Sequence, residues 1–214
     1  MGWELGDMST PNVTIIDYGV GNLLSVQRGF EYFGASVELT SDPEKILSAQ
    51  RVVLPGVGAF PKAMQALKSQ NLVTVIQELS NKGTPLLAIC LGMQLLTNSS
   101  EEGNVKGLGW INAKTVKFQL TDFPELKIPH MGWNDVNFPQ THFLCENYHE
   151  KPRFYFVHSY HVICDNDENK LMTTKHGIEF TSAIVKENIM GVQFHPEKSH
   201  KFGMTLFKNF IERC

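Results

Sequence analysis

The sequence has few cysteines and little excess charge, and it contains no long apolar run. Its 214 residues include four cysteines without C-x-x-C spacing, so neither a disulfide framework nor a zinc site is predicted. The formal net charge is −3 with no basic block, which argues against a nucleic-acid surface or a polybasic membrane patch. No run of about 18 apolar residues is present, so no membrane span is expected. Scattered thiols fit a reducing, cytoplasmic setting.

The chain does contain enough apolar sequence for one sizeable core. Hydrophobic residues make up 42% of it and charged residues 19%, which argues against disorder over most of its length. At this length a single α/β domain is favoured over two independent cores. Residues 1–11 lack the basic start and apolar run of a secretory signal and are interpreted as an N-terminal lead-in. We therefore expect one domain over residues 12–214.

Short apolar runs alternate with amphipathic segments through the first half of the chain. The periodicity predicts strands over residues 13–17, 36–39, 51–54 and 86–89. It predicts helices over residues 22–33, ending before Gly34, and over 61–82 in two pieces with a break near residues 70–71. Strands that alternate with helices indicate a mostly parallel central sheet flanked by helices.

The second half changes character. Four segments are rich in aromatic and β-branched residues and have no long helix between them: 109–119, 153–164, 171–175 and 180–194. Additional mixed or antiparallel strands are the simplest interpretation. A closing helix is expected over residues 202–211, with its aromatic side chains on one face.

Cys90 follows the apolar run of residues 85–89 and begins a predicted helix. Ala88 and Gly92 on either side would let the strand and the helix pack closely, as in a G-x-S-x-G elbow with sulfur in place of oxygen. At such a turn, backbone N–H groups and the positive end of a helix favour a thiolate. The alternative is a small buried hydrophobic residue, the commoner role of a lone cysteine. The elbow context favours a nucleophile.

His195 and Glu197 lie two positions apart after the apolar run of residues 189–194. In an extended segment both side chains point to the same face, so Glu197 can accept from Nδ1–H and leave Nε2 toward the sulfur. Pro196 cannot donate to a sheet ladder, so the strand should end here. Without a thiol, a surface His–Glu pair would be the simpler interpretation. With Cys90, the pair predicts acyl transfer through a thioester.

No metal or cofactor site is predicted. The other seven histidines are interpreted as structural. His158 and His161, three apart in one predicted strand, should point to opposite faces and are therefore poor joint metal ligands.

The loop of residues 54–59 follows a predicted strand, precedes a predicted helix and contains two glycines. Glycine tolerates peptide orientations that other residues resist, so backbone N–H groups can approach a ligand. The loop lacks a G-K-[ST] ending, so it indicates nucleotide binding only weakly. An oxyanion hole built from an N–H here and that of Leu91 is the stronger hypothesis. An ordinary strand-to-helix turn is the alternative.

Three motifs in this order and spacing resemble the class I, triad-type glutamine amidotransferases: P-G-V-G over residues 55–58, C-L-G-M-Q over 90–94 and H-P-E over 195–197. The resemblance covers nearly the whole chain after residue 12. Further matches resemble the branch of that family that acts in histidine biosynthesis, over residues 16–23, 129–134, 156–160 and 195–199. Members of this branch are glutaminase subunits that form a heterodimer with a (β/α)₈ cyclase.

The resemblance implies a role for each matching residue, and glutamine as substrate. Cys90 is the nucleophile, and His195, held by Glu197, acts as general base and then as general acid. Oxyanion and substrate binding is assigned to Val57, Gly58, Leu91, Gln94, His158, Ser159 and Tyr160. The interface with the cyclase, which receives the ammonia, is assigned to Asn22, Met131, Trp133 and Lys198.

Other interpretations of the same residues remain open. A glutaminase subunit of another amidotransferase would share the three motifs. A γ-glutamyl hydrolase or cysteine peptidase on a similar elbow would act without any partner. A non-catalytic binding subunit is disfavoured because Cys90, His195 and Glu197 are all present, and a degenerate site usually loses at least one.

Overall fold

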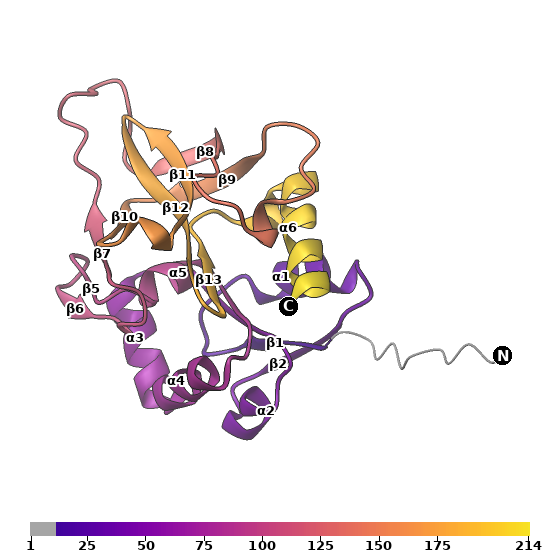
Figure 1. Ribbon diagram of the computed structural model, residues 1–214. Helices are drawn as coiled ribbons and strands as arrows, with labels where there is room; N and C mark the ends of the chain where they lie inside the picture. Colours follow the sequence, from indigo (N-terminus) through magenta and orange to yellow (C-terminus); the bar gives the residue numbers. More distant parts are fainter. Residues whose placement is uncertain (1–11) are drawn as a thin grey trace.

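Helices and strands alternate through the first half of the chain, and strands predominate in the second, in the computed structural model of residues 12–214 (Figure 1). The predicted lead-in, residues 1–11, lies outside the residues that the structure describes. The strands are β1 (Asn12–Ile16), β2 (Ser36–Thr40), β3 (Val52–Gly56), β4 (Leu86–Cys90), β5 (Ser99–Ser100), β6 (Val105–Lys106), β7 (Ala113–Lys117), β8 (His130–Asp135), β9 (Arg153–His158), β10 (Tyr160–Cys164), β11 (Lys170–His176), β12 (Ile178–Lys186) and β13 (Ile189–Val192). The helices are α1 (Leu23–Glu31), α2 (Pro43–Leu47), α3 (Phe60–Ser69), α4 (Leu72–Lys82), α5 (Leu91–Leu95) and α6 (His200–Arg213), and the 3₁₀ turns are η1 (Phe143–Cys145), η2 (Asp167–Asn169) and η3 (Pro196–Lys198).

Eleven of the described strands form one continuous sheet, in the order β2-β1-β3-β4-β13-β12-β10-β7-β5-β6, with β11 paired to β12. The pairs that join β2, β1, β3, β4 and β13 are parallel. Beyond β13 the pairing through β12, β10 and β7 is antiparallel. The strands β8 and β9 form an antiparallel ribbon of their own. The predicted parallel sheet with added mixed strands is confirmed.

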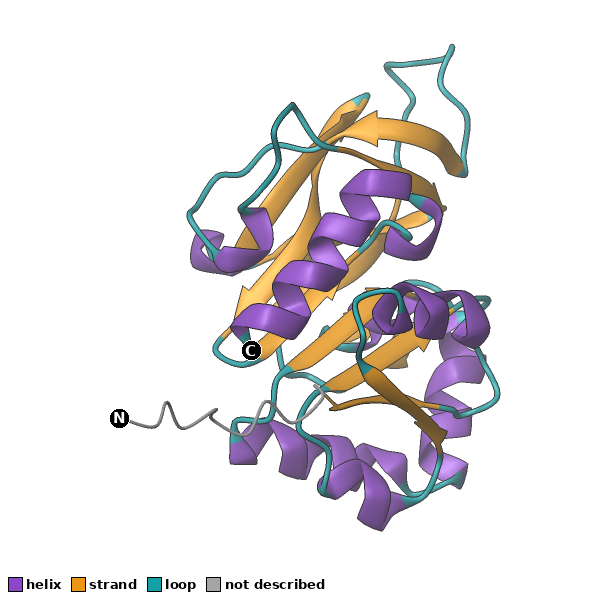
Figure 2. Ribbon diagram, turned by 90° about the vertical axis from the view of Figure 1, so that its right-hand side faces the viewer, coloured by secondary structure: helices purple, strands orange, loops and turns teal. Residues whose placement is uncertain are grey.

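Helices cover both faces of the parallel part of the sheet (Figures 1 and 2). On one face α1 packs against α6, where the rings of Phe30 and Phe207 lie 4.5 Å apart between centroids. On the other face α2 to α5 bury a second cluster of apolar side chains, which includes Ile46, Phe60 and Leu79. Across residues 12–214, no helix has both the length and the apolar composition that crossing a membrane requires.

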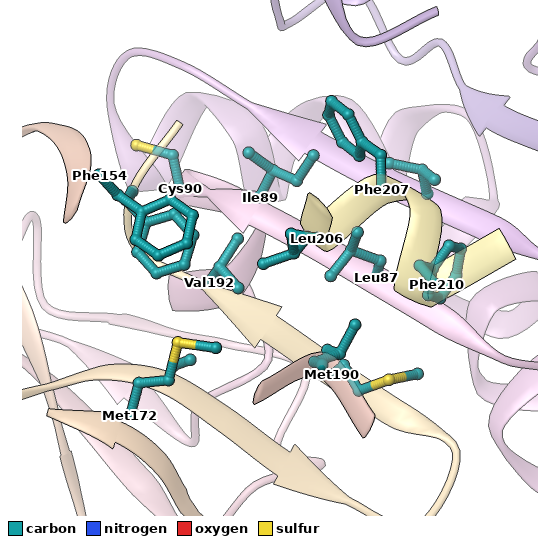
Figure 3. Packing of buried hydrophobic residues seen from close by; sticks show 14 of the residues in the cluster. Leu87, Ile89, Cys90, Phe154, Met172, Met190, Val192, Leu206, Phe207 and Phe210 are labelled. Carbon is teal, nitrogen blue, oxygen red and sulfur yellow. The ribbon is translucent and has the colours of Figure 1, made fainter. Parts of the chain in front are cut away.

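Figure 3 shows the core beneath α6. Ile89 of β4 and Val192 of β13 lie in one buried cluster with Leu206 and Phe207 of α6, and Cys90 belongs to the same cluster. Each large apolar side chain buried in this way contributes about 1.5–3 kcal/mol to folding. The packing of these side chains therefore fixes the position of β4, the strand that ends at Cys90.

Several predicted boundaries are confirmed by backbone conformation. Asn71 adopts a left-handed conformation, with φ 57°, between α3 and α4, and Gly34 does the same, with φ 79°, after α1. The short helix α2 was not predicted; its cap is Asp42, whose carboxylate accepts from the N–H of Glu44. The expectation that His158 and His161 lie in one strand is wrong, because Ser159 separates β9 from β10 and these two strands belong to different sheets.

Candidate active site

Three segments of the candidate site begin at the carboxyl ends of neighbouring strands. β3, β4 and β13 are parallel neighbours, with Gly56 opposite Cys90 and Ile89 opposite Val192. The carboxyl ends of these strands therefore lie side by side, which is where open α/β sheets place their ligands. The glycine loop follows β3, Cys90 ends β4, and His195 comes shortly after β13.

Cys90 sits on a strained turn between β4 and α5. Its backbone angles are φ 55° and ψ −110°, which a residue with a side chain rarely adopts and which commonly mark functional sites. The turn requires the predicted small residue at position 92, because a Cβ on Gly92 would lie 2.0 Å from the carbonyl oxygen of Leu54. The strand and the helix thus pack closely, and the predicted elbow is confirmed in geometry.

His195 and Glu197 form a buried pair. Nδ1 of His195 lies 2.8 Å from Oε1 of Glu197, and the two side chains are 3% and 1% exposed. The main chain also fixes the imidazole, because the N–H of His195 donates to Tyr155 O and Ser199 Oγ donates to His195 O. The predicted extended segment is wrong: Pro196 begins the 3₁₀ turn η3, which still brings the carboxylate back to Nδ1.

The electrostatics of this pair favour a protonated imidazole. Burial alone would lower the pKa of His195, but hydrogen bonds and charges from Cys90 and Glu197 outweigh it and raise the pKa to about 10. The thiol and the carboxylate thus act on the same ring. Since Nδ1 is engaged by Glu197, Nε2 is left for the sulfur. This is the geometry of a nucleophile with an oriented base.

A cavity of about 470 Å³ opens at this edge of the sheet. All of the residues predicted to bind the oxyanion or the substrate line it, together with the thiol and the imidazole. Its walls are formed by Val57, Gly58, Cys90, Leu91, Gln94, Glu102, Pro129, Val157, His158, Ser159, Tyr160, His195 and Lys198. Glu102, Pro129 and Val157 were not predicted.

The glycine loop forms one wall of the cavity. Val57 and Gly58 are exposed, and Gly58 has φ +91°. A Cβ at Gly58 would have no heavy atom of residues 12–214 within 4 Å beyond its chain neighbours, so no side chain packs against this position. The start of the loop is fixed, because the buried hydroxyl of Tyr18 donates to Pro55 O at 2.8 Å. The loop is therefore anchored at Pro55, while Val57 and Gly58 are exposed on the cavity wall.

Two glutamines connect the wall of the cavity to the thiol. The amide nitrogen of Gln94 donates to Tyr160 O at 3.2 Å and to Oε1 of Gln193 at 2.9 Å. The amide nitrogen of Gln193 in turn lies 3.7 Å from Sγ of Cys90. Gln193 was not identified from the sequence. It lies two positions before His195, and residues at this spacing in a strand point to the same face, so the spacing could have indicated it.

His158 is buried behind the cavity wall in a group of histidines. Its Nδ1 donates to Tyr160 O at 2.7 Å, and its Nε2 lies 3.0 Å from Nδ1 of His130. Burial lowers the pKa of His158 well below its usual value and that of His130 to about 4, so both rings are neutral near pH 7. The expectation that His158 and His161 face opposite ways is wrong, since both rings pack against Phe118 after the break at Ser159.

The residues assigned to a partner surface are spread over several elements. Met131 and Trp133, on one face of β8, are 62% and 38% exposed. Lys198 is exposed on the cavity rim, with Nζ 5.8 Å from the ring centre of Tyr155. Asn22 is half-buried at the start of α1. Only Lys198 of these four lines the cavity.

No group of three His, Cys, Asp or Glu side chains that could hold a metal occurs in residues 12–214.

Fold and site together define a class of protein. Residues 14–214 match the family model described as glutamine amidotransferase class-I, so the chain belongs to the class-I glutamine amidotransferase family. Within it, the chain is similar to imidazole glycerol phosphate synthase subunit HisH 2 of Methanococcus maripaludis, with 55% identity over 203 residues, 94% of this chain and 100% of the relative. It is also similar to HisH 2 of Pseudomonas aeruginosa, with 45% identity over 201 residues, 94% of this chain and 98% of the relative.

Solved structures share the fold at much lower identity. PurLQS from Thermotoga maritima has a TM-score of 0.72 at 15% identity and covers 94% of this chain and 98% of that chain. The glutaminase domain of CTPS from Trypanosoma brucei, with bound acivicin, has a TM-score of 0.65 at 15% identity and covers 94% of each chain. At these identities the likeness concerns the fold alone.

Proposed function

We propose that this chain is the glutaminase subunit of an imidazole glycerol phosphate synthase, and that it hydrolyses glutamine to glutamate and ammonia through a thioester on Cys90. The observation that carries the proposal is the site itself. A thiol on a strained elbow and a buried His195–Glu197 pair meet at one cavity beside a glycine loop. The names of the similar subunits from two organisms support the same function.

In the first half of the reaction, the Cys90 thiolate attacks the side-chain carboxamide carbon of glutamine and forms a C–S bond. The carbonyl oxygen becomes an oxyanion, which the N–H of Leu91 and an N–H of the Val57–Gly58 loop stabilise. Protonated His195 gives its Nε2 proton to the departing nitrogen, the C–N bond breaks, and ammonia leaves. Glu197 keeps the imidazole in the required tautomer throughout.

In the second half, water replaces ammonia. Neutral His195 takes a proton from water as the oxygen attacks the glutamyl thioester, and a second oxyanion forms in the same hole. The C–S bond then breaks and the electrons return to sulfur, which regenerates the thiolate and the imidazolium. Glutamate leaves, and the balance is one glutamine and one water converted to one glutamate and one ammonia.

Substrate recognition in this proposal involves other residues that line the same cavity. Backbone groups of His158, Ser159 and Tyr160 bind the amino-acid carboxylate of glutamine. Both N–H groups of the Gln94 amide are used by Tyr160 O and Gln193, so its oxygen is the atom left to accept from the substrate ammonium.

The partner in this proposal is a (β/α)₈ cyclase subunit, which takes up the ammonia and makes imidazole glycerol phosphate and the aminoimidazole carboxamide ribonucleotide. Asn22, Met131, Trp133 and Lys198 form the proposed interface of the heterodimer. Large exposed apolar side chains such as those of Met131 and Trp133 are typical of interface centres. Residues 12–214 act as one amidotransferase domain in the cytoplasm, where the thiol stays reduced.

The proposal predicts that the cyclase accelerates glutamine hydrolysis. We expect slow release of glutamate from the chain alone, and about 10²–10³-fold faster release with the cyclase and its phosphoribosyl formimino carboxamide nucleotide, because docking sets the second oxyanion donor in the glycine loop. Glutamate production is measured with each addition, and the Cys90→Ala chain supplies the background rate. Equal rates with and without the cyclase, or hydrolysis of peptides or folate polyglutamates instead, would contradict the proposal.

A second prediction concerns the close contact under the elbow. Gly92→Ala should lower kcat by about 10²–10³-fold, because a Cβ 2.0 Å from Leu54 O forces the N–H groups at the start of α5 away from the oxyanion. Stability should fall by about 1–3 kcal/mol, measured by urea unfolding. Gly29→Ala is the matched control, since its Cβ would lie 2.4 Å from the Phe207 ring, far from the cavity. If both variants lose the same fraction of kcat, the loss reflects stability and the oxyanion assignment fails.

A further inference from the structure

Gln193 is a fully buried polar side chain that the reaction described above does not use. It is 0% exposed and lies between β13 and His195, and its N–H pairs with Ser182 O on the neighbouring strand. A buried amide that lacks hydrogen-bond partners costs about 1–3 kcal/mol, so a strand core holds one only where its groups are engaged. The partners of this amide are Gln94 and Cys90.

The network fixes which end of the Gln193 amide faces the sulfur. The Gln94 amide nitrogen donates both to Tyr160 O and to Oε1 of Gln193. Tyr160 O is a carbonyl and can only accept, so the atom of Gln94 between these two partners must be nitrogen. The atom of Gln193 that faces Gln94 is consequently the oxygen, and the nitrogen faces Sγ of Cys90 at 3.7 Å.

We propose that Gln193 is a further catalytic residue, whose amide N–H donates to the Cys90 sulfur and stabilises its negative charge. The proposal rests on the glutaminase function given above. Sulfur is a weak acceptor as a thiol and a stronger one as a thiolate, so the donor contributes most when the sulfur carries charge. That state occurs twice, before attack on glutamine and when the thioester breaks.

Gln193 and His195 serve the sulfur in different ways. The imidazole exchanges a proton with the reacting groups, whereas an amide N–H cannot give up its proton and supplies only a fixed dipole. Because the Gln94 amide holds Gln193 and also contacts Tyr160 O, the same network touches the substrate-binding wall and the nucleophile. Removal of the donor should therefore reduce kcat by a larger factor than it raises KM, since the sulfur carries its charge in the chemical steps while Tyr160 O still holds the Gln94 amide.

Alkylation of Cys90 tests the donor without glutamine turnover. Gln193→Met has nearly the same length and no donor, and Gln193→Glu keeps the oxygen that accepts from Gln94 while it places a second oxygen at the sulfur. Iodoacetamide labelling at pH 7 is followed by mass spectrometry of the peptide that contains Cys90. The other thiols give little background, because burial raises the pKa of Cys145 to about 12 and those of Cys164 and Cys214 to about 11.

We expect both variants to label Cys90 about 10- to 100-fold more slowly than the wild type, and to lose kcat for glutamine by a similar factor. Thr174→Val is the matched control, since it removes a buried hydrogen bond of 2.8 Å to Ser182 on an adjacent strand. It should retain both rates. Should Gln193→Met fail to fold, Gln193→Leu, which also lacks a donor and adds no charge at the sulfur, replaces it.

Unchanged labelling in both variants overturns the role of Gln193, as does a raised KM with kcat and labelling intact. Failure of the glutaminase function gives a different result. In that case the wild type releases no glutamate even with the cyclase, while labelling of Cys90 still depends on Gln193.

Discussion

Cys90→Ala is expected to lower glutamate release from glutamine by about 10⁶-fold, the loss measured when a hydrolase nucleophile is removed. Alanine cannot form the thioester, and no other described cysteine replaces it, because Cys90 is the one that lines the cavity. Steady-state release of glutamate, with the cyclase present, measures the loss. Binding of the cyclase should persist, since Cys90 is 7% exposed and lies inside the cavity.

Cys164→Ala supplies the control for Cys90→Ala. Cys164 is also buried, at 6% exposure, but it lies on β10 and not on the cavity wall. The same substitution there should cost some stability and leave kcat close to that of the wild type. Substantial glutamate release from the Cys90→Ala chain would mean that the nucleophile is a different group.

Glu197→Gln is expected to lower kcat by about 10²–10⁴-fold. The amide oxygen can still accept from Nδ1 of His195, so the hydrogen bond of 2.8 Å can persist, but the negative charge is lost. The imidazolium that forms as Cys90 ionises is then less stable. Kinetics with glutamine measure the loss, and Glu102→Gln, on the cavity wall but not paired to the imidazole, is the control.

Glu197→Gln should also change the free energy of unfolding in a way that depends on pH. The folded pKa of His195 is about 10, above its ordinary value of 6.5, because Cys90 and Glu197 outweigh the effect of burial. A raised pKa stabilises the fold fully below about pH 6.5, and that stabilisation is lost as the pH rises through about 10. Glu197→Gln should therefore lower the free energy of unfolding by about 1.5–3 kcal/mol near pH 6.5, and by less as the pH approaches 10. A difference that grows with pH would have the wrong sign.

The parallel half of the fold was predictable because local signals determine it. Apolar runs with strand spacing gave β1, β3 and β4, and breaks at Gly34 and Asn71 ended helices where backbone conformation required it. The nucleophile, the base and the acid were found from side-chain chemistry and spacing. The elbow at Cys90 was predictable from the small residues Ala88 and Gly92 beside it, although the contact that requires Gly92 is with Leu54 O on β3.

The parts that were missed depend on distant partners. Residues 153–164 are rich in aromatic and β-branched residues on both sides of Ser159, and nothing within them indicates that β9 pairs with β8 while β10 joins the main sheet. The 3₁₀ turn η3 reaches the same His195–Glu197 contact that an extended segment would give, so the spacing does not distinguish the two. The orientation of the Gln193 amide depends on its hydrogen bond with Gln94, which lies far away in the sequence.

The central claim is tested most directly by trapping the covalent intermediate. The chain with its cyclase is mixed with isotopically labelled glutamine, quenched in acid during turnover, and digested for mass spectrometry. We predict a labelled glutamyl adduct on the peptide that contains Cys90, and no adduct in the Cys90→Ala chain. An adduct on another residue, or steady glutamate release with no adduct on Cys90 at any time, would contradict the claim.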